Sequence, residues 1–301
     1  MKRSVAVKFP NSVELFKFCQ KILSEQRGFK VHDQEVGSIL EFNPSDCSHW
    51  KRGEKNVRSV FALARLAEIL KVEEALIHDI ASSAIGIDEG YFEFQESNKI
   101  KETVLKAQEL LGDELTEVRA RVDRFVSQLH AQCEFSTPPL YLPEILRFFS
   151  FISTQPTEMI EKLSRILRLK PGKYSIHFRK GDLKPQTRMS MTKDLARILF
   201  EGERTRFPEL KMVTDPIIIQ YEILIFAANL LVPKTQLVEE LAKVDARKNI
   251  VSEMAAVFWV PKTLVGFQIQ DLIRHGALTK DKLLQDNASK TPSAWQPLNA
   301  S

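Results

Sequence analysis

The chain has 301 residues, of which 44% are hydrophobic and 27% charged, with 11 glycines and 14 prolines. This composition is typical of a soluble globular protein and excludes collagen-like and disordered chains, while the length predicts roughly two domains. The net charge of +4 is too small to indicate a polyanion-binding protein by itself. No apolar run reaches the ~18 residues that a membrane span needs, so we expect no membrane partner.

The amino terminus and the cysteines bear on the compartment. Residues 1–10 are basic but lack the apolar stretch of a secretory signal, so we expect a cytoplasmic protein. Cys19, Cys47 and Cys133 are far apart and show no CxxC spacing. We therefore expect reduced thiols, no disulfide and no thiolate metal site. We also expect no cofactor.

The N-terminal region, residues 1–95, is predicted to be a compact all-helical domain. Apolar residues recur there at helical spacing in two stretches. These are Val13, Leu15, Phe16, Cys19, Ile22 and Leu23, and then Val60, Leu63, Ala64, Leu66, Ala67 and Leu70. Between the two stretches, residues 33–53 predict two short helices joined by a tight turn. Gly37 is small where the two helices cross, Asn43 is a good N-cap, and Pro44 suits the first helical position.

At this point the sequence resembles the Cro/CI-type (XRE-like) helix-turn-helix family. The resemblance rests on residues 50–55, which begin with Trp50, and on residues 66–72, which read Leu-Ala-Glu-Ile-Leu-Lys-Val. It implies that the second helix enters the major groove of DNA. By the same resemblance, the residues that face the groove are Pro44, Ser45, Asp46 and His49, and those near phosphates are Asp33, Lys51, Lys55 and Arg58.

Two residues depart from that family's pattern. Asp33 stands where the family often has Gln, and Asp46 would repel phosphate unless it accepts a hydrogen bond from a cytosine amino group. Charge does not decide the matter, because residues 1–95 hold 13 basic and 14 acidic residues. A helical protein-interaction module is the alternative to a DNA-binding domain.

The middle and the end of the chain are predicted as three further segments. Residues 96–135 keep helical periodicity with one glycine and no proline, which predicts a helical connector and a candidate dimerisation element. Pro138 and Pro139 then mark the start of a second domain over 136–286. Within it, residues 173–179 alternate as a strand does, with turn residues at 180–182, and most of the remainder reads as helical. A polar tail, 287–301, contains Trp295.

The second domain resembles the ImmA/IrrE family of metallopeptidase-like proteins. A zinc peptidase of this kind needs His-Glu-x-x-His on one helix, and no such string occurs here. The resemblance rests on residues 188–203 and 222–233, and it implies an α+β zincin-like domain with a small sheet and a terminal helical hairpin over 254–276. Lys193 and Arg197 stand at the two histidine positions, Asp194 at the general-base position and Glu222 at the third-ligand position.

The charged forms of lysine and arginine cannot bind zinc, so we expect a degenerate, non-catalytic domain. Two roles stay open for these residues. In the first, Lys193 or Arg197 would form a buried ion pair with Glu222 in place of the metal. Alternatively, Arg188 and the same four residues line a cleft for an anionic small-molecule effector, because residues 161–211 hold 14 basic and 6 acidic residues.

Together these patterns predict a mainly α protein and a function. We expect a transcriptional regulator that binds double-stranded DNA as a homodimer, since one recognition helix rarely gives enough specificity. Its second domain would serve in sensing or assembly. The alternatives are an antitoxin-like or phage-defence adaptor that binds a protein partner, and a peptidase with a non-standard site. His177 and His275, the histidines of the second domain, lie far apart in the sequence, so we do not expect them to form a replacement metal site for such a peptidase.

Overall fold

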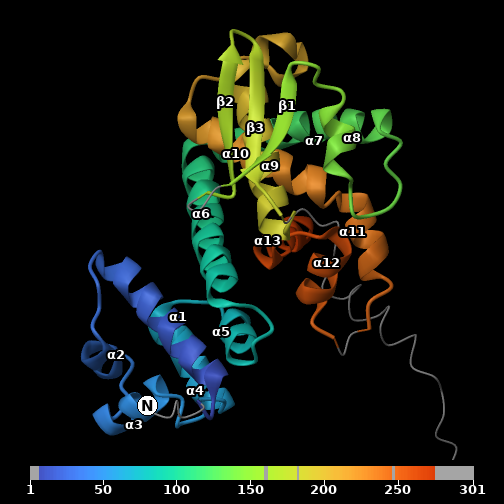
Figure 1. The fold of residues 1–301 in the computed structure, drawn as a ribbon. Coiled ribbons are helices and arrows are strands. Elements are labelled where there is room, and N and C mark those ends of the chain that lie inside the picture. Colours follow the sequence, from blue (N-terminus) through green and yellow to red (C-terminus); the bar gives the residue numbers. More distant parts are fainter. Residues whose placement is uncertain (1–6, 159–161, 182, 246–247, 275–301) are drawn as a thin grey trace, which may run out of the picture. The chain divides into compact units, whose positions relative to one another are not determined.

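The computed structural model describes residues 7–158, 162–181, 183–245 and 248–274. The chain divides into two compact units, Met1–Lys99 and Ile100–Ser301, and each is described by itself. Most of the chain is helical and one sheet is small (Figure 1), which confirms the mainly α fold class predicted from the sequence. The division between the units falls within α6, Ile87–Leu111.

The first unit is a helical bundle around one apolar core. It contains α1 (Pro10–Arg27), α2 (Asp33–Ile39), α3 (Pro44–Lys51), α4 (Val60–Leu70), α5 (Glu74–Ala81) and the start of α6. Helix α1 runs through the middle of the core, and its Leu15, Phe16, Cys19 and Ile22 are fully buried. The helical spacing predicted for both stretches is confirmed. Val60 is the exception to the burial pattern, because it is the first residue of α4 and is exposed.

The segment predicted as a connector is divided by Gly112. This glycine has a φ of 50°, which L side chains rarely adopt, and it separates α6 from a short 3₁₀ turn, Gly112–Glu114, and α7, Leu115–Gln132. Helix α7 buries Val118, Val122 and Phe125 in the core of the second unit. The second half of the predicted connector is therefore a core helix of that unit.

A three-stranded sheet follows the short helix α8, Leu142–Leu146. Its strands are β1 (Ile152–Thr157), β2 (Ser164–Lys170) and β3 (Lys173–Arg179), in the order β1-β3-β2. Strand β1 is parallel to β3, with Ile152 opposite Tyr174, and β2 is antiparallel to β3, with Ile166 opposite Ile176. The strand predicted at 173–179 is confirmed. The other two were predicted as helical, because β1 is almost wholly polar and the adjacent Ile166 and Leu167 break the alternation of β2.

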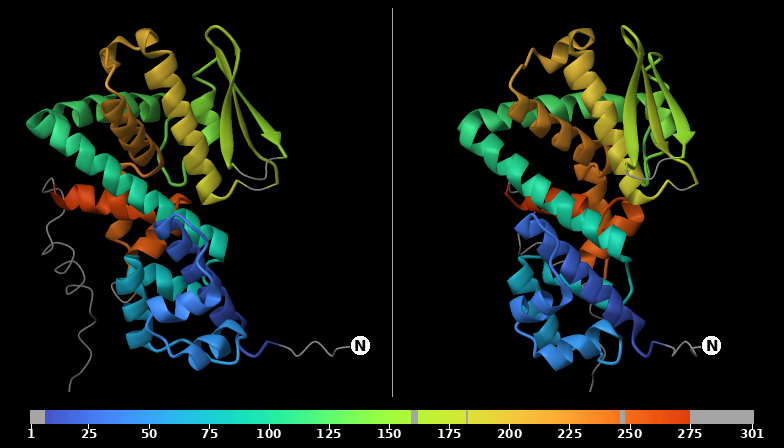
Figure 2. Two further views of the ribbon diagram at one scale, coloured as in Figure 1. Left: turned by 90° about the vertical axis from the view of Figure 1, so that its left-hand side faces the viewer. Right: turned by 60° about the vertical axis from the view of Figure 1, so that its left-hand side comes forward.

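Helices follow the sheet along the chain. They are α9 (Pro185–Arg197), α10 (Pro216–Leu231), α11 (Lys234–Leu241), α12 (Ile250–Phe258) and α13 (Lys262–Arg274). Helix α9 packs against β2 and β3 (Figure 2), and α10 packs against both α9 and α7. Because α10 has neighbours on all sides, it is buried from Tyr221 to Leu231, which explains why its sequence is apolar all round. The side chain of Asp215 caps its start by accepting from the amides of Ile217 at 2.7 Å and Ile218 at 3.3 Å.

Two further findings concern the helices that end the described chain. No single helix in the described ranges is long and apolar enough to cross a membrane, although α10 with α11 and α12 with α13 pass that test as bent pairs. Helices α12 and α13 meet with a bend of 111°, which is a corner and not an antiparallel hairpin. The predicted polar tail, Trp295 and His275 lie outside the described residues.

Candidate functional site

Helix α3 is fixed to the first unit through one face. Trp50 is fully buried, its Nε1 donates to the carbonyl of Ser12 at 2.6 Å, and its ring lies edge-on to Phe16 with centroids 5.2 Å apart. Cys47, one turn earlier, is buried on the same face. Because this face is held by a large aromatic side chain and a hydrogen bond, the opposite face of α3 has a defined orientation toward solvent.

The start of α3 and its crossing with α2 follow the sequence predictions. The side chain of Asn43 accepts from the amide of Ser45 at 3.0 Å, and Pro44 occupies the first helical position, so the predicted cap is confirmed. A Cβ atom on Gly37 would lie 3.0 Å from both Cβ and Sγ of Cys47. The predicted close approach of the two helices at Gly37 is confirmed as well.

The exposed face of α3 collects polar side chains. Ser45 and His49 are four residues apart and therefore lie on one side of the helix. The exposed residues of this stretch are Pro44, Ser45, Ser48, His49, Lys51 and Arg52, while Asp46 is half-buried. Ser45, His49 and Lys51, all predicted to contact DNA, are thus accessible from one side of the helix or its end.

Three local contacts with carboxylates involve the predicted contact residues; two are lysine ion pairs, and the third is a hydrogen bond of the His49 ring. Lys51 pairs with Asp33, Lys55 with Asp46 at 2.8 Å, and His49 Nδ1 with Glu54 at 2.5 Å. The hydrogen bond from Lys51 lowers the pKa of Asp33, and a further bond from Gln20 at 3.0 Å acts in the same direction. The lysines predicted to contact phosphate are thus paired with carboxylates in the unbound protein.

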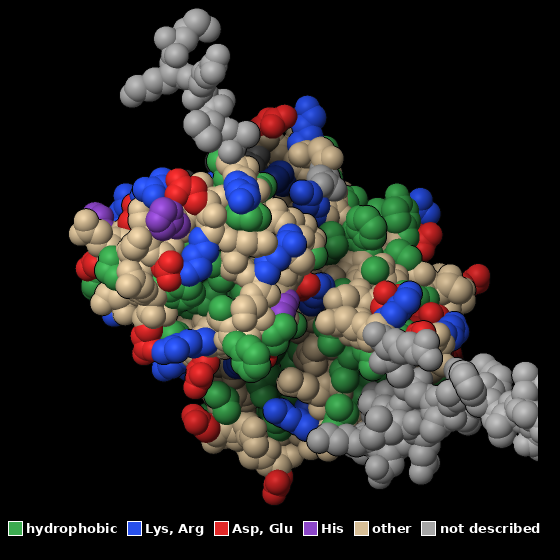
Figure 3. All heavy atoms as spheres, turned by 90° about the horizontal axis from the view of Figure 1, so that it is seen from below, with side chains coloured by type: hydrophobic (Ala, Val, Ile, Leu, Met, Phe, Trp, Pro, Cys, Tyr) green, Lys and Arg blue, Asp and Glu red, His purple; other side chains and the backbone are tan. Residues whose placement is uncertain are grey.

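Two arginines beside α3 differ in their surroundings. Arg52 donates to Glu54 through Nε at 2.9 Å, whereas exposed Arg58 has no ion pair among the described residues. Seen from below, Lys and Arg side chains are interspersed with Asp and Glu and do not gather into one basic patch (Figure 3). Residues 1–95 likewise hold nearly equal counts of basic and acidic residues.

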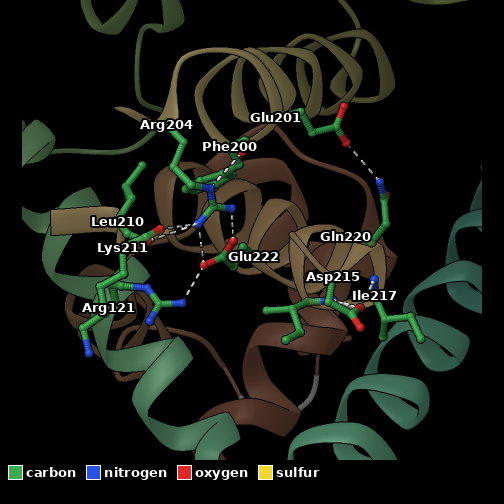
Figure 4. A network of polar contacts seen from close by, with 11 residues as sticks. Arg121, Phe200, Glu201, Arg204, Leu210, Lys211, Asp215, Ile217, Gln220 and Glu222 are labelled. Atoms are coloured by element: carbon green, nitrogen blue, oxygen red, sulfur yellow. Dashed lines mark hydrogen bonds and ion pairs between the residues drawn. The ribbon is translucent and has the colours of Figure 1, made fainter. Parts of the chain in front are cut away.

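A buried network in the second unit is centred on Glu222. This glutamate lies on α10, is fully buried, and accepts from Arg121 of α7 at 2.8 Å and from both terminal nitrogens of Arg204 (Figure 4). Arg204 also donates to the carbonyls of Phe200 at 2.9 Å and Leu210 at 3.1 Å. Both arginines are themselves buried. The network therefore holds two cations around one carboxylate and joins α7, α10 and the turn after α9.

The partners of Glu222 differ from those expected. The sequence prediction paired it with Lys193 or Arg197, but the structure pairs it with Arg121 and Arg204. Arg197 pairs instead with Asp194, three residues earlier, at 2.6 Å. The ion-pair prediction is wrong in its partners because α9 ends in a π-helical turn, Ile198–Gly202, after which Arg204 comes to lie beside Glu222.

Asp194 belongs to a second polar cluster. It is buried on α9, and its Oδ2 accepts from Ser164 Oγ of β2 at 2.6 Å. Burial raises its pKa, while the bonds from Ser164 and Arg197 oppose that rise. Ser164 also lies 2.6 Å from Ser190 Oγ. This cluster fixes α9 to the sheet.

Arg188 lies in a third environment, where its hydrogen-bond partners among the described residues are backbone carbonyls. It donates to Phe258 at 2.9 Å, Trp259 at 2.6 Å and Leu140 at 2.5 Å. Lys193 is half-buried on α9. Of the residues predicted to share one cleft, Arg188, Glu222 and the Asp194–Arg197 pair therefore belong to three separate sets of contacts.

Sequence reasoning missed Arg121 and Arg204. Neither belongs to a motif, and Arg121 looks like a solvated residue because it stands among the charged residues of a periodic helix. Only the packing of α7 against α10 brings Arg121 to Glu222. Within the described ranges, no three His, Cys, Asp or Glu side chains gather as metal ligands would.

Comparison with known proteins adds no relative. No protein-family model, curated protein or solved structure matches the chain.

Proposed function

We propose that this chain is a sequence-specific DNA-binding transcriptional regulator. The observation that carries the proposal is the geometry of α3, which is anchored by Trp50 on one face and presents Ser45 and His49 on the other. A short helix that is capped, rigidly held and polar on its outer face is the element that a helix-turn-helix domain places in the major groove. The crossing of α2 and α3 at Gly37 supports the same reading.

The local ion pairs fit this proposal because their lysines can exchange a carboxylate partner for a DNA phosphate. In the unbound protein Lys51 and Lys55 are paired with Asp33 and Asp46. Exposed pairs of this kind are worth about 0–1 kcal/mol, so phosphate oxygens can replace the carboxylates at little cost. Binding then requires two half-sites, and for that reason we propose a homodimer.

The second unit takes a non-catalytic role in this proposal, as a degenerate zincin-like domain for sensing or assembly. Lys193 and Arg197 are the cations of α9 that stand at the expected ligand positions, and Arg197 is engaged by Asp194. A carboxylate that holds an arginine three residues away is poorly placed to activate water. This interpretation predicts no peptidase activity.

The test has two steps. The protein first selects duplex DNA from a randomised library, and its affinity for the selected duplex is then measured by fluorescence anisotropy at two salt concentrations. The variant Ser45→Ala/His49→Ala should lose at least about tenfold in affinity, because each base contact contributes roughly 1–3 kcal/mol. The matched control is His78→Ala/Ser82→Ala, which removes the same kinds of side chain from α5 and from the residue that follows it and should bind as the wild type does. Selection of no consensus sequence, or equal loss in both variants, would refute the proposal.

One observation favours a second candidate function, the binding of a protein partner. Phe61 is 89% exposed and Val60 is 62% exposed at the start of α4, and adjacent exposed apolar side chains are typical of interfaces. Under this alternative, Val60→Ser/Phe61→Ser abolishes a stoichiometric complex with a protein partner, whereas Ser45→Ala/His49→Ala leaves that complex intact. Size-exclusion chromatography with light scattering distinguishes the two outcomes.

A further inference from the structure

The second unit contains a cavity to which the proposed function assigns no role. It has a volume of about 380 Å³, which is within the range of small-molecule sites. It lies between the segment before α8, the α9 side of the sheet and the end of α12. Its lining includes Leu140, Tyr141, Leu146, Phe178, Met191 and Trp259.

Two exposed aromatic rings form part of this lining, and one of them, Trp259, is held by a hydrogen bond. Trp259 is 48% exposed and Tyr141 is 60% exposed, although large aromatic side chains usually avoid water. The indole of Trp259 is held because its Nε1 donates to the carbonyl of Leu183 at 3.0 Å and its backbone adopts a φ of 53° at the end of α12. Aromatic rings that border an apolar cavity favour a flat, apolar ligand.

One charged residue, Arg188, lines the same cavity. It is 6% exposed, its bonds go to neutral carbonyls, and no acidic side chain among the described residues pairs with it. Burial alone lowers the pKa of Arg188 to about 10. A buried guanidinium without a carboxylate is costly, and its five donors leave some free after three bonds. An anion in the cavity would reduce that cost.

We propose that this cavity binds a small aromatic carboxylate, with the ring against Tyr141 and Trp259 and the carboxylate on Arg188. A phosphate is a poorer fit, because one guanidinium is surrounded by an otherwise largely apolar lining. A neutral aromatic molecule would use the rings but leave Arg188 without a counter-charge. The role of this ligand as an effector rests on the proposed function, whereas its binding to the cavity does not.

The test uses the full chain, without DNA, in calorimetric titrations with naphthylacetate and its neutral analogue naphthylacetamide. Naphthylacetate should bind at least about tenfold more tightly, because a charge-assisted bidentate bond contributes more than an amide does. Arg188→Gln should reduce this preference to near unity. Equal affinity of the wild type for both probes, or binding of neither, would overturn the proposal.

A second pair of variants leaves Arg188 in place. Thr154→Trp fills the cavity from β1, since Thr154 is exposed and belongs to the lining, and it should weaken naphthylacetate binding at least about tenfold. Ser153→Trp places the same bulk on the opposite face of that strand and should leave binding unchanged. Unchanged affinity in Thr154→Trp would refute the site. Probe binding by a chain that fails to select any DNA sequence would refute the proposed function and still support this one.

Discussion

The ion pairs around α3 and the network around Glu222 use the same chemical groups in opposite surroundings. Near α3, Asp33 and Lys51 are 42% and 50% exposed, so water competes for both charges. In the second unit, Glu222, Arg121 and Arg204 are buried, and no solvent can replace a missing partner. The comparison teaches that the exposed pairs can exchange partners during function, whereas the buried set fixes the fold of its unit.

The largest expected effect tests the buried side of this comparison. Glu222→Ala leaves Arg121 and Arg204 without their shared carboxylate, and we expect a loss of roughly 3–5 kcal/mol in the free energy of unfolding of the second unit. Differential scanning calorimetry resolves that transition. The control, Glu117→Ala, removes an exposed glutamate that pairs with Lys211 and should change nothing measurable. Similar transitions in both variants would show that burial does not distinguish the two kinds of pair.

Packing, and not charge, should govern stability in the first unit. Gly37→Ala adds a Cβ at 3.0 Å from Cβ and Sγ of Cys47, which is tighter than ordinary contact, so we expect a loss of about 1–3 kcal/mol. The measurement is urea denaturation of the full chain, followed by circular dichroism.

The double variant Gly37→Ala/Cys47→Ala removes the Sγ contact and retains the Cβ contact. If the double variant loses less free energy of unfolding than the sum of the losses in Gly37→Ala and Cys47→Ala, the two side chains compete for one space. Additive losses would show that α2 and α3 are not limited by this crossing.

The sequence predicted the first unit better than the second, for a physical reason. Caps, glycines and helical spacing act over a few residues, so Asn43, Pro44 and Gly37 could be placed correctly from local pattern. Strands β1 and β2 depend on pairing with β3, and neither alternates in a way that reveals a buried face. The mainly α class was predictable, but the sheet was only partly so.

The candidate site shows the same division. The exposed face of α3 follows from which residues must be buried, and those are apolar or aromatic. The partners of Glu222 come from α7 and from the turn after α9, 101 and 18 residues away in sequence, and no spacing rule reaches that far. A single sequence contains no signal for such a pairing.

The smallest expected effect tests whether the exposed pairs do exchange. Asp33→Asn removes the negative partner of Lys51, and stability should fall by less than about 1 kcal/mol because both side chains are exposed. DNA affinity should rise severalfold at low salt, and the salt dependence should steepen by about one counterion, because Lys51 is then free for phosphate. Anisotropy titrations across salt concentrations measure both. Asp88→Asn, which removes the carboxylate partner of Lys21, is the control and should bind as the wild type does. Unchanged affinity in Asp33→Asn would mean that Lys51 stays a structural partner, and the exposed pairs would then resemble the buried network after all.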